Sequence, residues 1–266
     1  MRKSMGQNFL IDPNIPEKIV RLSGIDDTCG VLEIGPGAGA LTKELARAAK
    51  LVIAVELDGR LMPLLTDAVS GFSNVEIIQG DILKLDIRKV VAEGMLDVSC
   101  HVCANLPYNI TTPAISAVID SGVFDTITVM VQREVGRRIC AAPASPDYGA
   151  FTVYVNYHAL SETLFGVPPE CFIPRPKVHS SVVRMILREK RLLSTEDEAR
   201  FFRVVRAAFS QRRKTLVNAL HSAFGGSMLK SRILEIVRSC GFDALVRGEA
   251  LGLYDFINLS TSLGVI

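Results

Sequence analysis

Strand-length apolar runs alternate with amphipathic stretches of helical spacing from residue 30 to about residue 140. The apolar runs are GVLEIG, LVIAVEL, VEIIQGD, VSCHVCAN and TITVMVQ, and the stretches between them include ALTKELARAA and TTPAISAVIDSG. Because strands separated by helices return in the same direction, this order predicts an α/β fold with a parallel sheet and helices on both faces. Two later runs, GAFTVYVNYH and SSVVRMILR, have no long helix between them and predict an antiparallel hairpin at one edge of the sheet.

The pattern changes after Arg188, where three stretches of helical spacing follow one another with glycines between them. We therefore expect two domains, a sheet domain over residues 1–187 and a small all-helical domain over residues 188–266. The charge divides in a similar way. Residues 1–186 carry 17 Lys and Arg against 20 Asp and Glu, whereas residues 187–266 carry 13 against 8. The basic charge is thus concentrated in the C-terminal segment.

Composition narrows the class of protein. A hydrophobic content of 48% suffices for a substantial core, and no run approaches the ~18 consecutive apolar residues that a membrane helix needs. The N-terminal MRKSMGQNFL is too short and too polar for a signal peptide, which favours a cytoplasmic location. The six cysteines fit a reducing compartment. Cys100 and Cys103 form a C-x-x-C pair, but no second pair completes a zinc site, so we expect no metal.

A glycine-rich turn lies between a predicted strand and a predicted helix. The segment VLEIGPGAGALT contains Gly35, Gly37 and Gly39. Glycines at this point let the backbone approach a ligand closely, and the first turn of the helix offers unpaired N–H groups. The pattern alone is a weak signal. It departs from the G-x-G-x-x-G of nicotinamide dinucleotide sites, because the third glycine falls one residue early and Pro36 lies inside the turn.

Acidic residues end the next two predicted strands. Glu56 in AVELD stands where a carboxylate can accept hydrogen bonds from both ribose hydroxyls of an adenosine. Asp81 in IQGDIL stands where a carboxylate can receive the exocyclic amine of an adenine, beside the backbone of Ile82. One acid at a strand end is common on protein surfaces. Matched positions at three successive strand ends favour a nucleoside-binding site.

The set E-x-G-x-G-x-G, VELD and GD resembles the S-adenosylmethionine-dependent methyltransferases with a seven-stranded, Rossmann-like sheet. The resemblance implies S-adenosyl-L-methionine as the cofactor and an antiparallel last strand in the edge hairpin. The residues that it implies as cofactor contacts are Glu33, Gly35, Gly37, Glu56, Leu57, Asp81, Ile82 and Asn105.

Asn105-Leu106-Pro107-Tyr108 resembles the [N/D]-[P/I/L]-P-[Y/F] motif of enzymes that methylate exocyclic amines of nucleobases. The lone pair of an adenine amine is delocalised into the ring, so the Asn105 side-chain oxygen and the Leu106 carbonyl can activate it by accepting its hydrogen bonds. Pro107 fixes φ and helps present that carbonyl. Tyr108 offers a ring on which an extruded base can stack, worth ~1–3 kcal/mol. A proline turn over a core tyrosine is the alternative.

Two further segments resemble the rRNA adenine dimethylase family. In GQNFLIDPNIPEKIV, Asn8 and Leu10 match cofactor contacts of that family. ECFIPRPKVHSSVVR resembles its loop between the last two strands, where Phe172 matches an aromatic residue that faces the Tyr108 ring across the target base. Arg175 and Lys177 in this loop could contact phosphates. A lone phenylalanine between strands usually belongs to the core, so that alternative remains open.

The segment AFSQRRKTLVNAL resembles the small-subunit, KsgA-type branch of the family. On a helical wheel Arg203, Arg206, Arg213 and Lys214 form a basic stripe away from most of the apolar residues, which favours RNA contact over a solvated face. The resemblance implies N6,N6-dimethylation of two adjacent adenosines near the 3′ end of small-subunit (16S) rRNA during ribosome biogenesis. The partner would be this rRNA in a pre-ribosomal particle, and a monomer is the default.

Two alternative functions stay open at this point. A large-subunit adenine methylase of the macrolide-resistance type shares most of these motifs, although the AFSQRRK segment argues against it. A non-catalytic RNA-binding assembly factor could keep the same fold. The intact Glu33, Glu56, Asp81 and NLPY disfavour that alternative, because a chain released from catalysis need not keep them all.

Overall fold

The computed structural model describes residues 8–211 and 213–264, so Gly6 and Gln7 of the N-terminal motif lie outside the described residues. The chain divides into two compact units. The first contains the described residues through Gly136 together with Leu160–Arg188, and the second contains Arg137–Ala159 and the described residues from Glu189 onward. Residues 137–159, which we expected in the sheet domain, therefore group with the C-terminal helices.

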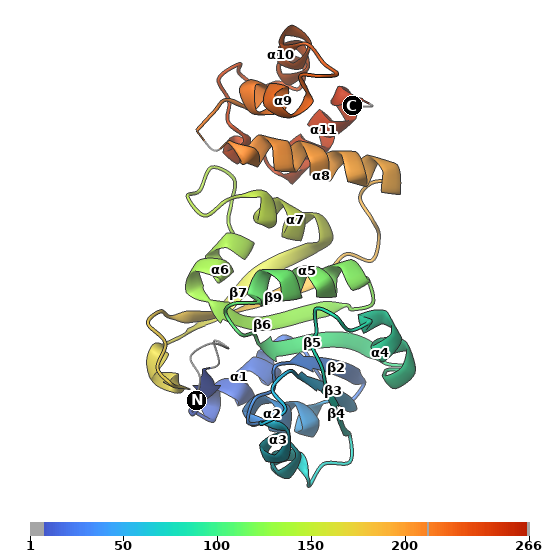
Figure 1. Ribbon diagram of the computed structural model, residues 1–266, viewed down its shortest axis with the longest axis vertical. Helices are drawn as coiled ribbons and strands as arrows, with labels where there is room; N and C mark the ends of the chain where they lie inside the picture. The colour runs from blue at the N-terminus through green and yellow to red at the C-terminus, as the bar shows by residue number, and fades with distance from the viewer. Residues whose placement is uncertain (1–7, 212, 265–266) are drawn as a thin grey trace. The chain divides into compact units, whose positions relative to one another are not determined.

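The first unit is built on a mixed sheet. Within the described residues it has seven strands in the order β4-β3-β2-β5-β6-β9-β7 (Figure 1). Neighbouring strands from β4 to β6 run parallel, whereas β9 pairs antiparallel with β6. The predicted parallel sheet with an antiparallel last strand is confirmed. The strands are β2 (Cys29–Ile34), β3 (Leu51–Glu56), β4 (Val75–Gln79), β5 (Ser99–Asn105), β6 (Thr126–Gln132), β7 (Ala159–Val167) and β9 (Ser180–Leu187).

Helices cover both faces of this sheet, because the side chains of each buried strand alternate between the faces. On one face, α1 and α2 pack against the strands in a cluster that includes Ile19, Leu45 and Val52. On the other face, a Cβ added to Gly94 of α4 would lie 2.6 Å from the Cδ1 atom of Ile53. The helices of this unit are α1 (Asn14–Ser23), α2 (Ala40–Ala48), α3 (Met62–Val69), α4 (Ile87–Gly94) and α5 (Thr111–Ser121), while α6 (Arg133–Ile139) begins in it and ends in the second unit.

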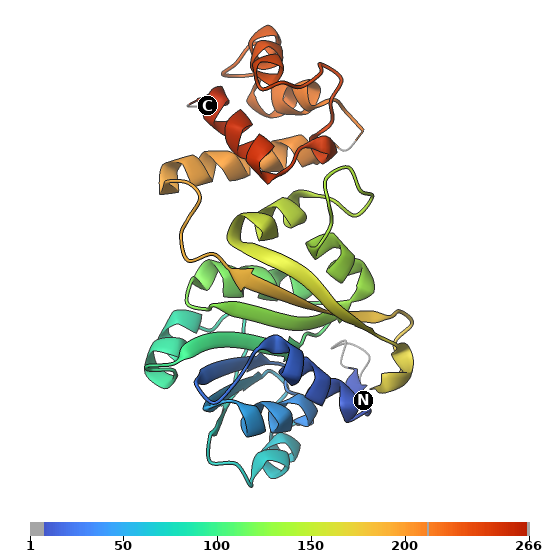
Figure 2. The same cartoon turned by 180° about the vertical axis from the view of Figure 1, so that it is seen from behind.

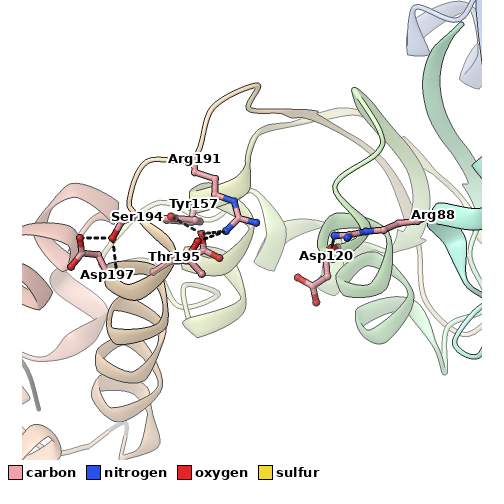
Figure 3. A network of polar contacts seen from close by, with 8 residues as sticks. Arg88, Asp120, Tyr157, Arg191, Ser194, Thr195 and Asp197 are labelled. Carbon is pink, nitrogen blue, oxygen red and sulfur yellow. Dashed lines mark hydrogen bonds and ion pairs between the residues drawn. The ribbon is translucent and has the colours of Figure 1, made fainter. Parts of the chain in front are cut away.

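An arginine ties α4 to the end of α5. Arg88 Nε donates to the carbonyl oxygen of Ser121 at 2.7 Å, and its Nη2 atom donates to the carbonyl of Asp120 at 3.4 Å (Figure 3). These are two of the carbonyls that a helix end leaves without intrahelical partners. The charge of the arginine also complements the negative end of the helix dipole.

The edge hairpin consists of β7 and β9, which lie side by side (Figures 1 and 2). The prediction that GAFTVYVNYH supplies one of these strands is wrong, because this segment forms α7 (Ala150–His158) in the second unit. The Gly149 N–H donates to Thr152 Oγ1 at 3.1 Å where the helix begins. Val153 and Tyr157, four residues apart, enter the helical core together. Tertiary burial thus overrides the strand preference of the β-branched and aromatic residues.

The second unit is helical around one core cluster that includes Phe201, Leu220 and Phe256. Its C-terminal helices are α8 (Thr195–Ser210), α9 (Leu216–Phe224), α10 (Lys230–Ser239) and α11 (Leu253–Leu263). Ser194 and Thr215 begin α8 and α9 by accepting hydrogen bonds from the backbone amides three residues later. Tyr157 donates to Glu198, which also pairs with Arg191 beside Thr195 (Figure 3).

The single continuous helix that the AFSQRRKTLVNAL pattern suggested is wrong. The chain leaves the helix after Ser210 and starts a new one at Leu216. Gln211 Nε2 donates to Ser222 Oγ at 3.0 Å across the turn. Among the residues that the structure describes, no helix is both long and apolar enough to cross a membrane.

Candidate active site

A cavity of about 330 Å³ opens at the carboxyl ends of β2, β3, β4 and β5. Parallel strands deliver the residues that follow them to one edge of the sheet, which is where α/β proteins bind ligands. Every residue expected to contact the cofactor lines this cavity: Asn8, Leu10, Glu33, Gly35, Gly37, Glu56, Leu57, Asp81, Ile82 and Asn105. The chain therefore assembles residues separated by up to 97 positions in one wall.

All three glycines of the turn after β2, Gly35, Gly37 and Gly39, have left-handed φ angles. Gly35 and Gly37 have φ angles of +68° and +62°, which are left-handed conformations that other residues rarely adopt. A Cβ at Gly35 would lie 3.3 Å from Pro107 Cδ, and one at Gly37 would lie 3.1 Å from Phe9 Cε1. The turn thus lets the backbone pass close to the NLPY segment on one side and to the N-terminal segment on the other.

Glu56 holds this turn in place. Its side chain is buried, and its two oxygens accept from different backbone amides, Oε2 from Gly37 at 3.0 Å and Oε1 from Asp58 at 2.8 Å. A carboxylate oxygen has two acceptor sites, so each can take one further hydrogen bond from a ligand in the cavity. Asp58 in turn pairs with Arg60, whose Nε donates to Asp58 Oδ1 at 2.8 Å.

Glu33 is a buried acid with an unused acceptor. It is 1% exposed, it lines the cavity, and its Oε2 atom has no hydrogen-bond partner among the described residues. Burial raises the pKa of Glu33 to about 8, the nearby Glu56 charge acts in the same direction, and the Thr42 hydroxyl opposes both. An unpaired buried acceptor is unfavourable, so this wall suits a ligand that brings a cation or an N–H donor.

Asp81 and Ile82 follow β4 on the cavity wall. Asp81 Oδ1 accepts from the Leu83 backbone amide at 3.1 Å, and Oδ2 lies 3.8 Å from Lys84 Nζ. Ile82 is buried. A carboxylate beside an apolar side chain suits a flat ring with an exocyclic amine at its edge.

The NLPY segment follows β5 and presents two acceptors. Asn105 Nδ2 donates to the carbonyl of Asn8 at 3.2 Å, which leaves the Oδ1 atom of the same amide to accept. The Leu106 amide donates to the Met130 carbonyl at 3.1 Å, whereas its own carbonyl accepts no hydrogen bond from the residues described. The Pro107 carbonyl is occupied, because it accepts from the Ile110 amide at 3.1 Å.

Tyr108 is fixed at the far end of its ring. Its hydroxyl lies 2.8 Å from the Oγ atom of Ser180, the first residue of β9. Burial raises the pKa of Tyr108, while the hydrogen bond with Ser180 opposes the shift. The phenol is therefore neutral near pH 7, and its half-buried ring lines the cavity. Sequence reasoning missed Ser180, although it stands in the ECFIPRPKVHSSVVR segment that resembles the family loop.

Phe172 does not face the cavity. It lies in β8 (Phe172–Ile173), which pairs antiparallel with β1 (Phe9–Leu10). Its ring is 2% exposed and belongs to the core cluster of α1 and α2, whereas the next residue, Ile173, is 54% exposed. The structure therefore places Phe172 in this core cluster and not among the residues that line the cavity, and its expected role opposite Tyr108 stays a prediction. Successive residues of a strand point to opposite sides, and the core takes the aromatic one.

The structure also brings residues to the cavity that the sequence did not single out. They are Phe9, Ile34, Pro36, Ala38, Ala40, Leu41, Val55, Gly80, Leu83, Asn109 and Ile110. Most flank a predicted contact in the chain. Their position next to the motifs in the sequence was the signal that could have identified them. The burial of each residue in the folded chain decides which of these neighbours face the cavity.

The predicted RNA-binding residues are exposed and belong to different units. Arg175 and Lys177 lie in the loop before β9, where Arg175 pairs with Glu170. In the second unit the Arg203 guanidinium stacks 5.6 Å from the centre of the Phe224 ring on α9, and Arg206 lies one turn further along α8. The other two, Arg213 and Lys214, are in the turn between α8 and α9 rather than on a helix.

Comparisons with known proteins agree on one family of proteins. A family model described as ribosomal RNA adenine dimethylase matches residues 1–250. A ribosomal RNA small subunit methyltransferase A from Shouchella clausii is 45% identical over 265 residues, which cover 99% of this chain and 90% of that protein. A protein of the same name from Listeria monocytogenes is 42% identical over 267 residues, with 99% and 90% covered.

Two solved structures resemble nearly the whole chain. A dimethyladenosine transferase from Plasmodium falciparum superposes with a TM-score of 0.78 at 27% identity, covering 94% of this chain and 95% of that one. The 23S rRNA methyltransferase ErmE superposes with a TM-score of 0.75 at 25% identity, covering 96% and 99%.

Proposed function

The chain belongs to the ribosomal RNA adenine dimethylase family, and from this we propose that it is the member that acts on the small ribosomal subunit. It is an S-adenosyl-L-methionine-dependent methyltransferase whose substrate is the N6 amino group of adenine in small-subunit rRNA. We infer that it dimethylates two adjacent adenosines near the 3′ end of that RNA, in four methyl transfers.

The residues around the cavity fit the cofactor. The free acceptor capacity of Glu56 suits ribose hydroxyls, and Asp81 beside Ile82 suits an adenine ring. The unpaired buried oxygen of Glu33 suits the positively charged part of the cofactor. When bound, S-adenosyl-L-methionine supplies an electrophilic methyl group on a sulfonium. The glycines of the turn would let the backbone approach it closely.

The pair of free acceptors at Asn105 and Leu106 is the observation that carries the proposed chemistry. The bond from Asn105 Nδ2 to the Asn8 carbonyl fixes the orientation of the amide, because a carbonyl can only accept. Asn105 Oδ1 and the Leu106 carbonyl then accept from the two N–H groups of an adenine amine. Those bonds draw electron density toward the nitrogen and strengthen as it gains positive charge.

The target base reaches these acceptors only when it is unstacked from its RNA. We propose that the Tyr108 ring stacks on it and sets the distance of its amine from the methyl group. The bound cofactor would supply the methyl group to the amine nitrogen, and the amine would release one proton to solvent. The acceptors are neutral groups, so this chemistry needs no general base with a matched pKa.

The basic residues support a proposed RNA surface on each unit. Arg175 and Lys177 stand in the loop that leads to Ser180, and we propose that they contact phosphates near the target. Arg203, Arg206, Arg213 and Lys214 are the proposed contacts of the helical unit. We further infer that the protein works in the cytoplasm as a monomer on a pre-ribosomal particle.

Action on the large subunit is disfavoured by sequence. The structural similarity to ErmE shows that the fold serves a 23S rRNA enzyme, at 25% identity. Relatives from Shouchella clausii, Geobacillus kaustophilus and Anoxybacillus flavithermus, each 45% identical over nearly the whole chain, carry the small-subunit name. A fold shared by both kinds of enzyme cannot discriminate between them, so the sequence relatives decide the assignment.

Incubation with methyl-labelled S-adenosyl-L-methionine and unmethylated ribosomal subunits tests this function. Small and large subunits are assayed in parallel, and the RNA is digested to nucleosides. We expect dimethyladenosine from the small subunit alone. Methyl label in the large-subunit RNA would indicate that the protein belongs to the large-subunit branch of the family. Absence of label from both subunits, with the cofactor still bound, would support the non-catalytic alternative.

A further inference from the structure

We propose that Ser180 is a positioning residue for methyl transfer, which holds the Tyr108 ring in the orientation that stacks the target base. The proposal rests on the proposed function, because it gives a role to the partner of a residue already placed at the base. It adds a residue from the last strand of the sheet to a site otherwise built from the N-terminal segment and the ends of the parallel strands.

The contact between the two residues is the basis of the proposal. The Tyr108 hydroxyl lies 2.8 Å from Ser180 Oγ, across 72 residues of chain. A tyrosine side chain has two rotatable bonds, and its hydroxyl is the atom farthest from the backbone. A hydrogen bond at that atom therefore restricts the direction in which the ring points far more than a contact near Cβ would.

Ser180 is itself rigidly held. It is fully buried and begins β9, where it pairs with Gln132 at the end of β6. The residue before it is also anchored, since the His179 carbonyl accepts from the Arg133 amide at 2.9 Å. A buried hydroxyl on a paired strand has little freedom, so the ring is fixed to the sheet rather than to a mobile loop.

The backbone of Tyr108 needs such an external support. Tyr108 lies between the end of β5 and the start of α5, in the turn closed by the bond from the Ile110 amide to the Pro107 carbonyl. One side of its half-buried ring faces the cavity. A ring that must accept a base on that side needs a partner elsewhere to prevent it from rotating into the empty space.

The position of Ser180 also places this support next to the RNA-facing loop. Arg175 and Lys177, the proposed phosphate contacts, lie in the exposed segment that ends at Ser180. We infer that β9, whose first residue holds the Tyr108 ring, directly follows the segment that contacts the RNA. Removing the Ser180 hydroxyl should then impair the orientation of the base more than the affinity for RNA.

A double-mutant cycle on the full-length protein tests this inference. Ser180→Ala, Tyr108→Phe and the double variant are compared with the wild type by kcat and KM for unmethylated small subunits and by the Kd of S-adenosyl-L-methionine. Each single change should lower kcat by about fivefold with KM changed less than about twofold, and the double change should be no worse than either single one. Cofactor affinity should be unchanged.

Ser181→Ala is the matched control. Ser181 is the next residue of the same strand, is also buried, and pairs with Val131, but no hydrogen bond from it to Tyr108 exists among the residues described. This variant should keep the wild-type kcat. Thermal unfolding of all variants reports whether any of them has lost the fold, and Ser180→Cys, which keeps a weaker polar group of similar size, should recover part of kcat.

The outcomes separate this proposal from the proposed function. If kcat losses of the two single variants multiply in the double variant, or if Ser181→Ala lowers kcat as much as Ser180→Ala, the positioning role is overturned while methylation by the wild type stands. If the wild type transfers no methyl group to either subunit, the function itself fails. A rise in KM at constant kcat would assign Ser180 to RNA binding instead and overturn the inference.

Discussion

The backbone amide of Gly37 donates a hydrogen bond of 3.0 Å to the Oε2 atom of Glu56, a residue 19 positions further along the chain. This bond joins the turn after β2 to the end of β3, which are neighbours in the sheet. Gly37 has a φ of +62°, a left-handed conformation that other residues rarely adopt, so the turn that carries this amide favours glycine. The glycine turn and Glu56 therefore stabilise each other before any ligand binds.

Gly37→Ala should weaken cofactor binding by at least about tenfold, or ~1.4 kcal/mol. An added Cβ would lie 3.1 Å from the Phe9 ring, and the left-handed backbone would be strained. Gly122→Ala is the control, because Gly122 has a φ of +64° with no atom near its added Cβ. Both variants should lose ~1–2 kcal/mol of stability from strain, but only the first should lose affinity in a calorimetric titration. If Gly37→Ala and Gly122→Ala bind the cofactor with equal affinity, the close packing of the backbone at Gly37 does not contribute to cofactor binding.

Asn105→Ala should reduce methyl transfer at saturating cofactor by at least about tenfold, or ~1.4 kcal/mol. The change removes the Oδ1 acceptor and the bond to the Asn8 carbonyl together. Asn105→Asp keeps an acceptor at this position, although it replaces the donor with a second carboxylate oxygen and adds a negative charge. It should retain more activity than the alanine variant in single-turnover assays with small subunits. Unchanged turnover of Asn105→Ala would exclude the acceptor role.

The buried Glu33 should make the stability of the protein without ligand depend on pH. Its pKa is raised to about 8 in the folded protein from an ordinary value of 4.5, so between these limits the unfolded chain binds fewer protons than the folded one. The free energy of unfolding should therefore fall as pH rises from about 5 to about 8, by on the order of a few kcal/mol. Glu33→Gln carries no such charge and should flatten that fall, as measured by denaturant unfolding at several pH values.

Glu93→Gln provides the control for this pH series, because Glu93 is an exposed acid on α4. Its pH profile should parallel that of the wild type. If Glu33→Gln also follows the wild-type profile, then Glu33 is already ionised in the folded protein and the source of the pH dependence lies elsewhere.

Changing Arg206 and Arg213 together to Ala should weaken RNA binding and reduce its dependence on salt. Each phosphate contact releases counterions, so the slope of log K against log salt should fall by about 1 to 2 for two lost contacts. Arg232→Ala is the control, since Arg232 is exposed on α10 and pairs with Glu235 at 3.1 Å. Filter binding at several salt concentrations measures the slopes. An unaltered slope in the double variant would exclude these two residues from the RNA interface.

The packing of distant segments decided the structure at two places where the sequence suits more than one environment. GAFTVYVNYH has strand-forming composition, but it forms α7 because Val153 and Tyr157 are buried together in the helical core. Phe172 resembles a site residue, but its strand pairing with Leu10 turns the ring into the core. In both cases the residue type suits two environments, and the packing of distant segments selects one.

The sequence by itself determined the parallel direction of the strands, the glycine turn, and the acids and NLPY residues at the strand ends. These features are local, and the direction of parallel strands brings their carboxyl ends to one edge without further information. Only the tertiary structure decided that Phe172 is core, that the basic stripe of the C-terminal segment is split between α8 and a turn, and that Ser180 meets Tyr108. Each depends on contacts between residues far apart in the chain, which local periodicity does not encode.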